Sequence, residues 1–325
     1  MALRRRELIR AAGAALVMPA LARFASAQSF PSRPVRIIVG YAAGGGTDIS
    51  ARVIGQWLSE RLGQQFVIEN RPGAATNIAT EAVARSAPDG YTLLLATAAN
   101  AINASYYDKL NFDFLRDLVP VGAVMRVPLV VVVHPDFPAK TVAELIDYAK
   151  ANPGKINFAS GGAGGPDHMG AEYFRLATGT QMQHVAYRGL NPALTDLIGG
   201  QVQLVFATVP AAIEHIKAGK LRALAVTTLA RSEALPQLPA LSEILPGFIA
   251  IQWYGLCAAK NTPADVIAVL HREIQSGLAD PKLKARMADL GGEAMPMPAA
   301  DFGKFIQADT EKWAKVVKFA ATKAN

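Results

Sequence analysis

Two glycine-rich stretches carry the residue types that could bind an anion. The first is Tyr41–Asp48, with the sequence YAAGGGTD, and the second is Ser160–Pro166, with the sequence SGGAGGP. Each follows an apolar, strand-like run and precedes a helix-like run. Each would therefore bring free backbone N–H groups and the positive end of a helix dipole to one point, which suits a carboxylate or a phosphate. The alternative for each stretch is a plain strand-to-helix turn, because such turns are often glycine-rich.

The elements around the first stretch predict an α/β fold with a parallel sheet. Three apolar runs have the length of strands, and two segments with helical spacing of apolar residues lie between them. The strands are predicted at Val35–Gly40, Gln65–Glu69 and Tyr91–Ala96, and the helices at Ile49–Leu62 and Asn77–Arg85. Thr47 or Asp48 is expected to cap the first helix. Ligands of such sheets bind beyond the carboxyl ends of the strands, so Gly44–Asp48 and Thr97–Asn100 should face the same crevice.

The same order of elements begins again in the middle of the chain, which indicates two lobes. Two strands, Val119–Met125 and Leu129–His134, are predicted with a break at Pro128. A further strand, the second glycine turn and a helix follow, and Thr208 ends another strand. We predict residues 28–127 plus 253–325 as the first lobe and residues 128–252 as the second. The two crossings, near Val127 and Gln252, would form a hinge.

The N-terminus is expected to be an export signal rather than part of the fold. Residues 1–27 contain a charged region at Arg4–Arg6, an apolar stretch too short to span a bilayer, and a small-residue cleavage site at Ala25–Ala27. Arg5 and Arg6 also resemble a twin-arginine signal. These residues carry +4 of the formal net charge of +7, so about +3 remains after cleavage. That charge gives little support to nucleic-acid binding.

Several kinds of chemistry find no support in the sequence. The one cysteine, Cys257, lies in an apolar run and is expected to be a buried, inert thiol. The five histidines are scattered, with no Cys/His cluster for a metal. Ser160 could be considered as a nucleophile, but it lacks the G-x-S-x-G context and no His/Asp pair can be identified for it. We therefore expect neither an enzyme nor a metalloprotein.

The residues taken together resemble the periplasmic solute receptors of tripartite tricarboxylate transporters, also called Bug-type receptors. The resemblance covers nearly the whole chain after the export signal. Its most specific segments are YAAGGGTDISAR (41–52), ENRPGAATNIATEAVARSAPDGYTLL (69–94), INFASGGAGGPDHMGAEYF (156–174), AYRGLNPALTDLIGGQVQL (186–204) and AGKLRALAVTTLAR (218–231). The family usually has threonine where Gly165 stands, so one hydroxyl donor is missing from the second stretch.

The resemblance implies a fold, a function and a site. The fold is a two-lobed type II periplasmic binding fold, a Venus flytrap. The function is capture of a small organic carboxylate in the periplasm and its delivery to membrane permease subunits, with no reaction and no cofactor. We also expect a monomer. The implied contacts are Tyr41, Gly44, Gly45, Gly46, Thr47 and Asp48 on one lobe, and Ser160, Gly161, Gly164, Gly165, Pro166 and His168 on the other.

Some questions stay open at this stage. Thr97, Asn100 and Thr208 follow strands and could line the cleft, and the Tyr187 phenol could reach it or serve its own turn. Asp48 could contact the ligand or act in the helix cap, and His168 could donate in the cleft or pack in the first helical turn. A receptor that signals through a membrane sensor kinase is the alternative to transport. The identity of the carboxylate is not readable from the sequence.

Overall fold

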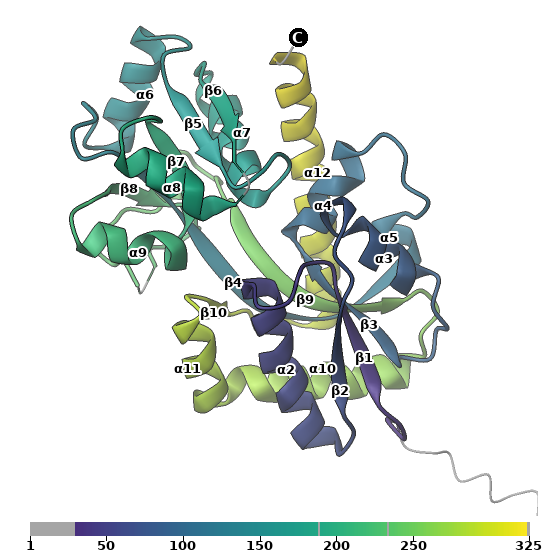
Figure 1. Ribbon diagram of the computed structural model, residues 1–325. Coiled ribbons are helices and arrows are strands. Elements are labelled where there is room, and N and C mark those ends of the chain that lie inside the picture. Colours follow the sequence, from purple (N-terminus) through teal and green to yellow (C-terminus); the bar gives the residue numbers. More distant parts are fainter. Residues whose placement is uncertain (1–29, 188, 233, 324–325) are drawn as a thin grey trace, which may run out of the picture.

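One mixed β-sheet runs through two groups of helices in the computed structural model, which describes residues 30–323 except 188 and 233. The predicted export signal, residues 1–27, lies outside the described residues. The strand order is β2-β1-β3-β9-β4-β7-β5-β6, and β8 and β10 also pair with β4. In Figure 1 the helices α6 to α9 cluster around one half of the sheet and α2, α10 and α11 around the other.

The first half contains the parallel β-α-β-α-β unit expected from the sequence. Strand β1 lies between β2 and β3 and is parallel to both. The elements of this first half are β1 (Val35–Val39), α2 (Gly46–Leu62), β2 (Phe66–Asn70), the 3-10 turn η2 (Ala74–Thr76), α3 (Asn77–Ala84), β3 (Thr92–Thr97), α4 (Ala98–Tyr106) and α5 (Phe114–Asp117). Helix α2 begins three residues before the expected Ile49, because Gly46, Thr47 and Asp48 already belong to its first turn.

The second half contains the elements after the middle of the chain. Strand β5 is parallel to β6 and β7. The elements are α6 (Val142–Ala151), β5 (Asn157–Ser160), α7 (Pro166–Thr178), β6 (Gln183–Ala186), α8 (Leu190–Ile198), β7 (Leu204–Thr208), α9 (Val209–Lys217), β8 (Arg222–Val226) and the 3-10 turn η3 (Leu241–Glu243). The chain then returns through β9 (Ile251–Ala259), α10 (Ala264–Ala279), α11 (Pro281–Asp289), β10 (Glu293–Ala294) and α12 (Ala299–Lys323).

A single long strand, β4 (Leu118–Val133), replaces the two strands that were expected on either side of Pro128. The prediction of a break was wrong because proline needs only a position whose N–H is not required by the ladder. The partners of β4 do change there. Up to Pro128 it pairs with β9, and from Leu129 it pairs with β7 and β8. Thr227 fixes this junction, since it exchanges hydrogen bonds with Leu129 and accepts the N–H of Ala250.

Helix α12 comes directly after β10 in the sequence and packs against both halves of the molecule. It contacts α4 on one side and α7 on the other, and Figure 1 shows it standing between them. Trp313 of α12 and Trp253 of β9 are both fully buried. Among the described residues, no helix is both long and apolar enough to cross a membrane.

Candidate ligand-binding site

The first glycine loop is fixed by the carboxylate of Asp48. The Gly44 N–H donates to Asp48 Oδ2 over 2.9 Å, and Arg52 Nε donates to the same oxygen over 2.9 Å. The other oxygen, Oδ1, accepts from Arg52 Nη2 at 3.1 Å and from Asn70 Nδ2 at 3.0 Å. Both oxygens of Asp48 are thus occupied within the protein. This favours a structural role for Asp48 over direct ligand contact.

The N-terminus of α2 has no side-chain cap, although the carboxylate of Asp48 holds the loop before it. The N-cap is Gly45, which makes no side-chain cap bond, so the expectation of a Thr47 or Asp48 cap was wrong. The first N–H groups of any helix lack an intrahelical acceptor. Here Gly44, Gly45 and Gly46 are exposed, and a Cβ at Gly44 or Gly46 would meet no atom within 4 Å. The first turn of α2 therefore offers accessible donors at the positive end of a helix.

The second glycine loop uses its donors internally. The Gly161 N–H donates to Asp167 Oδ2, and the Gly164 N–H donates to His168 Nδ1 over 3.0 Å. The Gly165 N–H points at Gly162 O, 3.5 Å away. Pro166, the first residue of α7, has no N–H. Of the residues expected to bind a ligand here, most contribute to the loop's own hydrogen bonds.

The two loop carboxylates have opposite electrostatic environments. Burial alone would raise the pKa of Asp48, but hydrogen bonds from Arg52, Gly44 and Asn70 together hold that pKa below its usual value. Burial also raises the pKa of Asp167, and the N–H groups of Gly161 and His168 offset only part of this effect. The charged form of the Asp167 carboxyl group is therefore destabilised by desolvation, and its hydrogen bonds offset this only in part, although the residue is partly exposed.

Tyr41, in the first glycine loop, lies near enough to Asp167 of the second for their charges to interact. Burial raises the pKa of Tyr41 to about 12, a hydrogen bond with Thr97 offsets part of this effect, and the Asp167 carboxylate adds to it. The phenol therefore stays protonated at neutral pH. Asp167 belongs to α7, so this interaction joins the second half of the fold to the first. Tyr254 of β9 in turn lies beside Thr47 at the start of α2.

A histidine cluster lies behind the second loop, where sequence analysis found none. The rings of His168 and His184 stack with centroids 3.8 Å apart, and Ser160 Oγ is 2.7 Å from His184 Nε2. Burial lowers the pKa of His184 to about 4, so its ring is neutral at neutral pH. Ser160 thus has the histidine partner that the sequence did not reveal. Its side chain is nevertheless fully buried, so a substrate could not reach it.

The cluster borders a cavity of about 760 Å³ between α7, β6, α4 and α12. Glu172 and Arg175 line it together with His168, and Arg175 Nη1 donates to both oxygens of Glu172 at 2.7 and 2.8 Å. His168 therefore lines this cavity, and its Nδ1 accepts a hydrogen bond from the Gly164 N–H of the loop. That geometry favours packing in the first helical turn over donation into the cleft.

The remaining candidate residues are Thr97, Asn100, Tyr187 and Thr208. Thr97 holds the Tyr41 hydroxyl and caps α4, with its Oγ1 accepting from the Ala99 N–H at 3.2 Å. Asn100 is 2% exposed, and its amide bonds to Thr97, Thr76 and Thr80, so it has no free group for a ligand. The Tyr187 hydroxyl donates to Asp196 Oδ2 of α8 over 2.6 Å. Thr208 is half-buried at the start of α9.

Three residues near the loops escaped the sequence analysis: Asp167, Gln252 and Tyr254. Asp167 is a single acid in a helix start that was expected to attract anions. Gln252 and Tyr254 lie in an apolar run that reads as core, yet both were placed near the predicted crossing. A polar residue inside an otherwise apolar strand near the predicted crossing is the signal that could have identified them.

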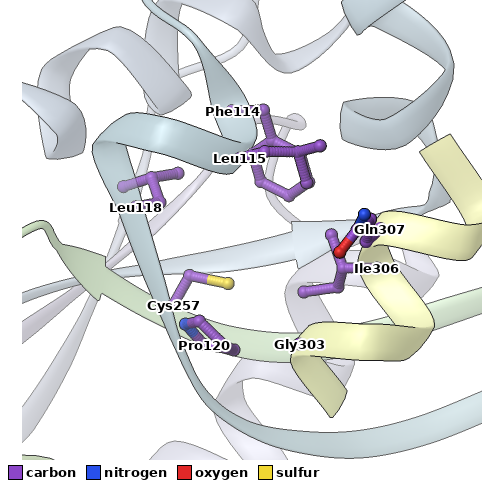
Figure 2. Close-up of a pocket in the computed structure, with 8 residues that line it drawn as sticks. All are labelled: Phe114, Leu115, Leu118, Pro120, Cys257, Gly303, Ile306 and Gln307. Carbon is purple, nitrogen blue, oxygen red and sulfur yellow. The ribbon is translucent and has the colours of Figure 1, made fainter. Parts of the chain in front are cut away.

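A second cavity, far from both loops, has a different character. It has a volume of about 360 Å³ and lies between α5, β4, β9 and α12, with Phe114, Leu118, Cys257 and Ile306 in its wall (Figure 2). Cys257 is 1% exposed, and burial raises its thiol pKa to about 12, as expected for an inert cysteine. In the described part of the chain, no group of three or more His, Cys, Asp or Glu is placed to hold a metal.

Comparison with known proteins agrees with this geometry. Residues 50–321 match the model of the tripartite tricarboxylate transporter family receptor, TctC. The structure of the periplasmic binding protein BugD is similar, with 36% identity and a TM-score of 0.73, covering 90% of this chain and 99% of that one. Rpa4515 of R. palustris with adipate has 34% identity and a TM-score of 0.77, covering 90% and 98%.

A third similar structure is MatC (Rpa3494) from Rhodopseudomonas palustris with bound malate. It has 29% identity and a TM-score of 0.74, covering 89% of this chain and all of that one. The architecture is therefore the mixed α/β fold of periplasmic binding proteins. The chain belongs to the TctC family of tripartite tricarboxylate transporter receptors, which are solute-binding proteins and not enzymes.

Proposed function

We propose that this receptor captures a small organic carboxylate in the periplasm, between its two lobes, and delivers it to the permease subunits of a tripartite tricarboxylate-type transporter. The observation that carries the proposal is the open N-terminus of α2. The exposed Gly45 and Gly46 make no side-chain cap bond, and the helix dipole favours a negative ligand there. The similar structures with adipate and malate support the same ligand class.

The lobes act as residues 28–127 plus 253–325 and residues 128–252. The change of β4 partners at Pro128 and Leu129 supports a hinge at that point. A ligand that touches α2 on one lobe and α7 on the other stabilises the closed form by its differential affinity for that form. The permease recognises the closed receptor.

A thermal-shift screen against a panel of small carboxylates tests the ligand class. A ligand that binds only the folded state raises the unfolding temperature in proportion to the logarithm of its concentration over its Kd. At least one carboxylate should raise the melting temperature, and its amide or alcohol analogue should not. A folded protein that responds to no carboxylate would contradict the proposal.

Co-purification with the permease tests delivery. A neighbouring gene for a permease, and capture of its membrane subunits only with the ligand present, would support transport. Capture of a sensor kinase instead would support the signalling alternative.

A further inference from the structure

The last residue of α4 brings an aromatic ring against the second glycine loop. Tyr106 ends α4, and Gly164 lies in the loop that precedes α7. A Cβ placed on Gly164 would lie 3.3, 3.4 and 3.5 Å from Cε1, Cδ1 and Cζ of the Tyr106 ring. Because three neighbouring ring atoms are at nearly equal distances, the ring presents its face to the glycine. This Tyr106–Gly164 contact joins residues that belong to different proposed lobes.

Each side of the Tyr106–Gly164 contact is fixed within its own half of the molecule. The Gly164 N–H donates to His168 Nδ1 over 3.0 Å, and the His168 ring stacks on His184 with centroids 3.8 Å apart. On the other side, α4 packs along α12 and begins after Thr97, whose side chain hydrogen-bonds with Tyr41 of the first glycine loop. Helix α4 therefore connects the first glycine loop to the second.

The space beside this contact is not filled by protein. It is the cavity of about 760 Å³, whose wall includes Ser105 and Tyr106 from α4 and Ala163 and His168 from the second half. Tyr106 itself remains 39% exposed. A region with few buried apolar contacts opens at a low cost in free energy. The two halves can therefore separate here without disrupting a packed core, and the ring stabilises them where they touch.

We propose that Tyr106 is a positioning residue for ligand capture. Its ring packs on Gly164 in the closed form and leaves that contact in the open form, so it determines how long the lobes stay closed over a carboxylate. The inference rests on the proposed function. The ring acts through the closed form and not through the ligand, so it changes the apparent affinity for every carboxylate by the same factor. Tyr106 thus controls residence time and overall affinity, and it leaves selectivity unchanged.

Dissociation rates measured by stopped-flow fluorescence test the inference. Tyr106→Ala removes the ring, whereas Tyr106→Phe keeps the ring and removes only the hydroxyl group. The probes are malate, succinate, glutarate and adipate, together with any other acid that raises the melting temperature of the wild type. For each acid that binds, Tyr106→Ala should raise the dissociation rate constant about tenfold, equal to about 1.4 kcal/mol, and leave the association rate constant within about twofold. Tyr106→Phe should match the wild type.

Two comparisons distinguish this role from a purely structural one. Val67→Ala removes another exposed apolar side chain of the first half, 48% exposed on the edge strand β2, and should keep the wild-type rates. Isothermal titration of Tyr106→Ala should show every acid weakened by the same factor, with the order of affinities unchanged. Weaker binding of only some acids, or a slower association with unchanged dissociation, would overturn the inference because the ring would then act on the ligand or on the shape of the open site.

The outcomes also separate the inference from the function on which it rests. Unchanged dissociation rates in a folded Tyr106→Ala, or equal changes in Tyr106→Ala and Tyr106→Phe, would overturn the inference and leave the carboxylate receptor intact. If the folded wild type binds no acid of the panel, the proposed function fails, and small-angle X-ray scattering decides the role of the contact. Unliganded Tyr106→Ala should then have a larger radius of gyration than the wild type and Tyr106→Phe, and equal radii would overturn the inference as well.

Discussion

The two glycine loops look alike in sequence and differ in what they offer a ligand. Each has a glycine N–H bonded to an aspartate a few residues later, Gly44 to Asp48 and Gly161 to Asp167. In the first loop Arg52 and Asn70 complete the coordination of the carboxylate, and the helix N-terminus stays open. In the second loop, no side chain among residues 30–187, 189–232 and 234–323 donates to the aspartate, and the backbone donors are used internally. Neighbours outside the glycine motif thus decide which loop can hold an anion.

Blocking the open helix start should produce the largest effect. Gly46→Leu adds a side chain where a Cβ meets nothing within 4 Å, so the fold should be unaffected. The side chain would cover the first-turn N–H groups and remove two charge-assisted hydrogen bonds, about 3–6 kcal/mol in total. Affinity for the carboxylate found in the screen should fall at least about 100-fold by isothermal titration.

Gly199→Leu is the matched control for that variant. Gly199 is also exposed, has an ordinary φ of −81°, and lies at the end of α8. It should bind like the wild type. Full affinity in Gly46→Leu would show that the open N-terminus of α2 does not hold the ligand, and the contrast between the loops would lose its functional meaning.

Removing the brace of the first loop should affect stability more than any change in the second. Asp48→Ala leaves the Gly44 N–H, Arg52 and Asn70 without their common acceptor, and Asp48 is 2% exposed. The expected loss is about 1–3 kcal/mol in the free energy of unfolding, measured by urea denaturation. Asp117→Ala, whose ion pair with Arg116 lies in a short exposed helix, is the comparison and should cost less. Equal losses would mean that the loop does not depend on Asp48.

The sequence predicted the order of elements because the periodic apolar runs are long and the connections short. The parallel unit β2-β1-β3 follows from such patterns. The continuity of β4 through Pro128 could not be predicted, because it depends on the long-range partners β7, β8 and β9. Local propensity alone favours a break at a proline.

The sequence predicted where the candidate site lies, but it did not predict which groups there are free to bind a ligand. Glycine turns after strands identified where the chain could approach a ligand. Which N–H groups stay free depends on pairs such as Gly164 with His168 and on stacking of His168 with His184, which joins residues sixteen apart across β6. The raised pKa of Asp167 depends on how deeply the fold buries its carboxyl group, which no spacing rule contains.

The glycine conformations provide a smaller test of the same contrast. Gly164 has φ +79°, is buried, and a Cβ there would lie 3.3 Å from the ring of Tyr106. Gly164→Ala should therefore cost about 1–2 kcal/mol of stability, because an L-residue is strained in the left-handed region. Gly45→Ala is the matched variant, since Gly45 has φ −80° and only one atom within 4 Å. Urea unfolding should show a loss for the first and almost none for the second; similar midpoints would contradict the assigned loop conformations.

The opposite pKa shifts of the two aspartates predict opposite pH dependences of the free energy of unfolding. Asp48 has a lowered pKa, so its contribution to stability is present above its unfolded value of 3.8 and is lost as the pH falls through the lowered value. Asp167 has a raised pKa, so its contribution is present below 3.8 and is lost as the pH rises through the raised value.

Asp48→Asn should be less stable than the wild type at neutral pH, with the deficit shrinking in acid. Asp167→Asn should be as stable as the wild type or more so at neutral pH, and this advantage should shrink in acid. Urea midpoints measured along a pH series check both, and parallel pH profiles for the two variants would mean that the loops share one electrostatic environment after all.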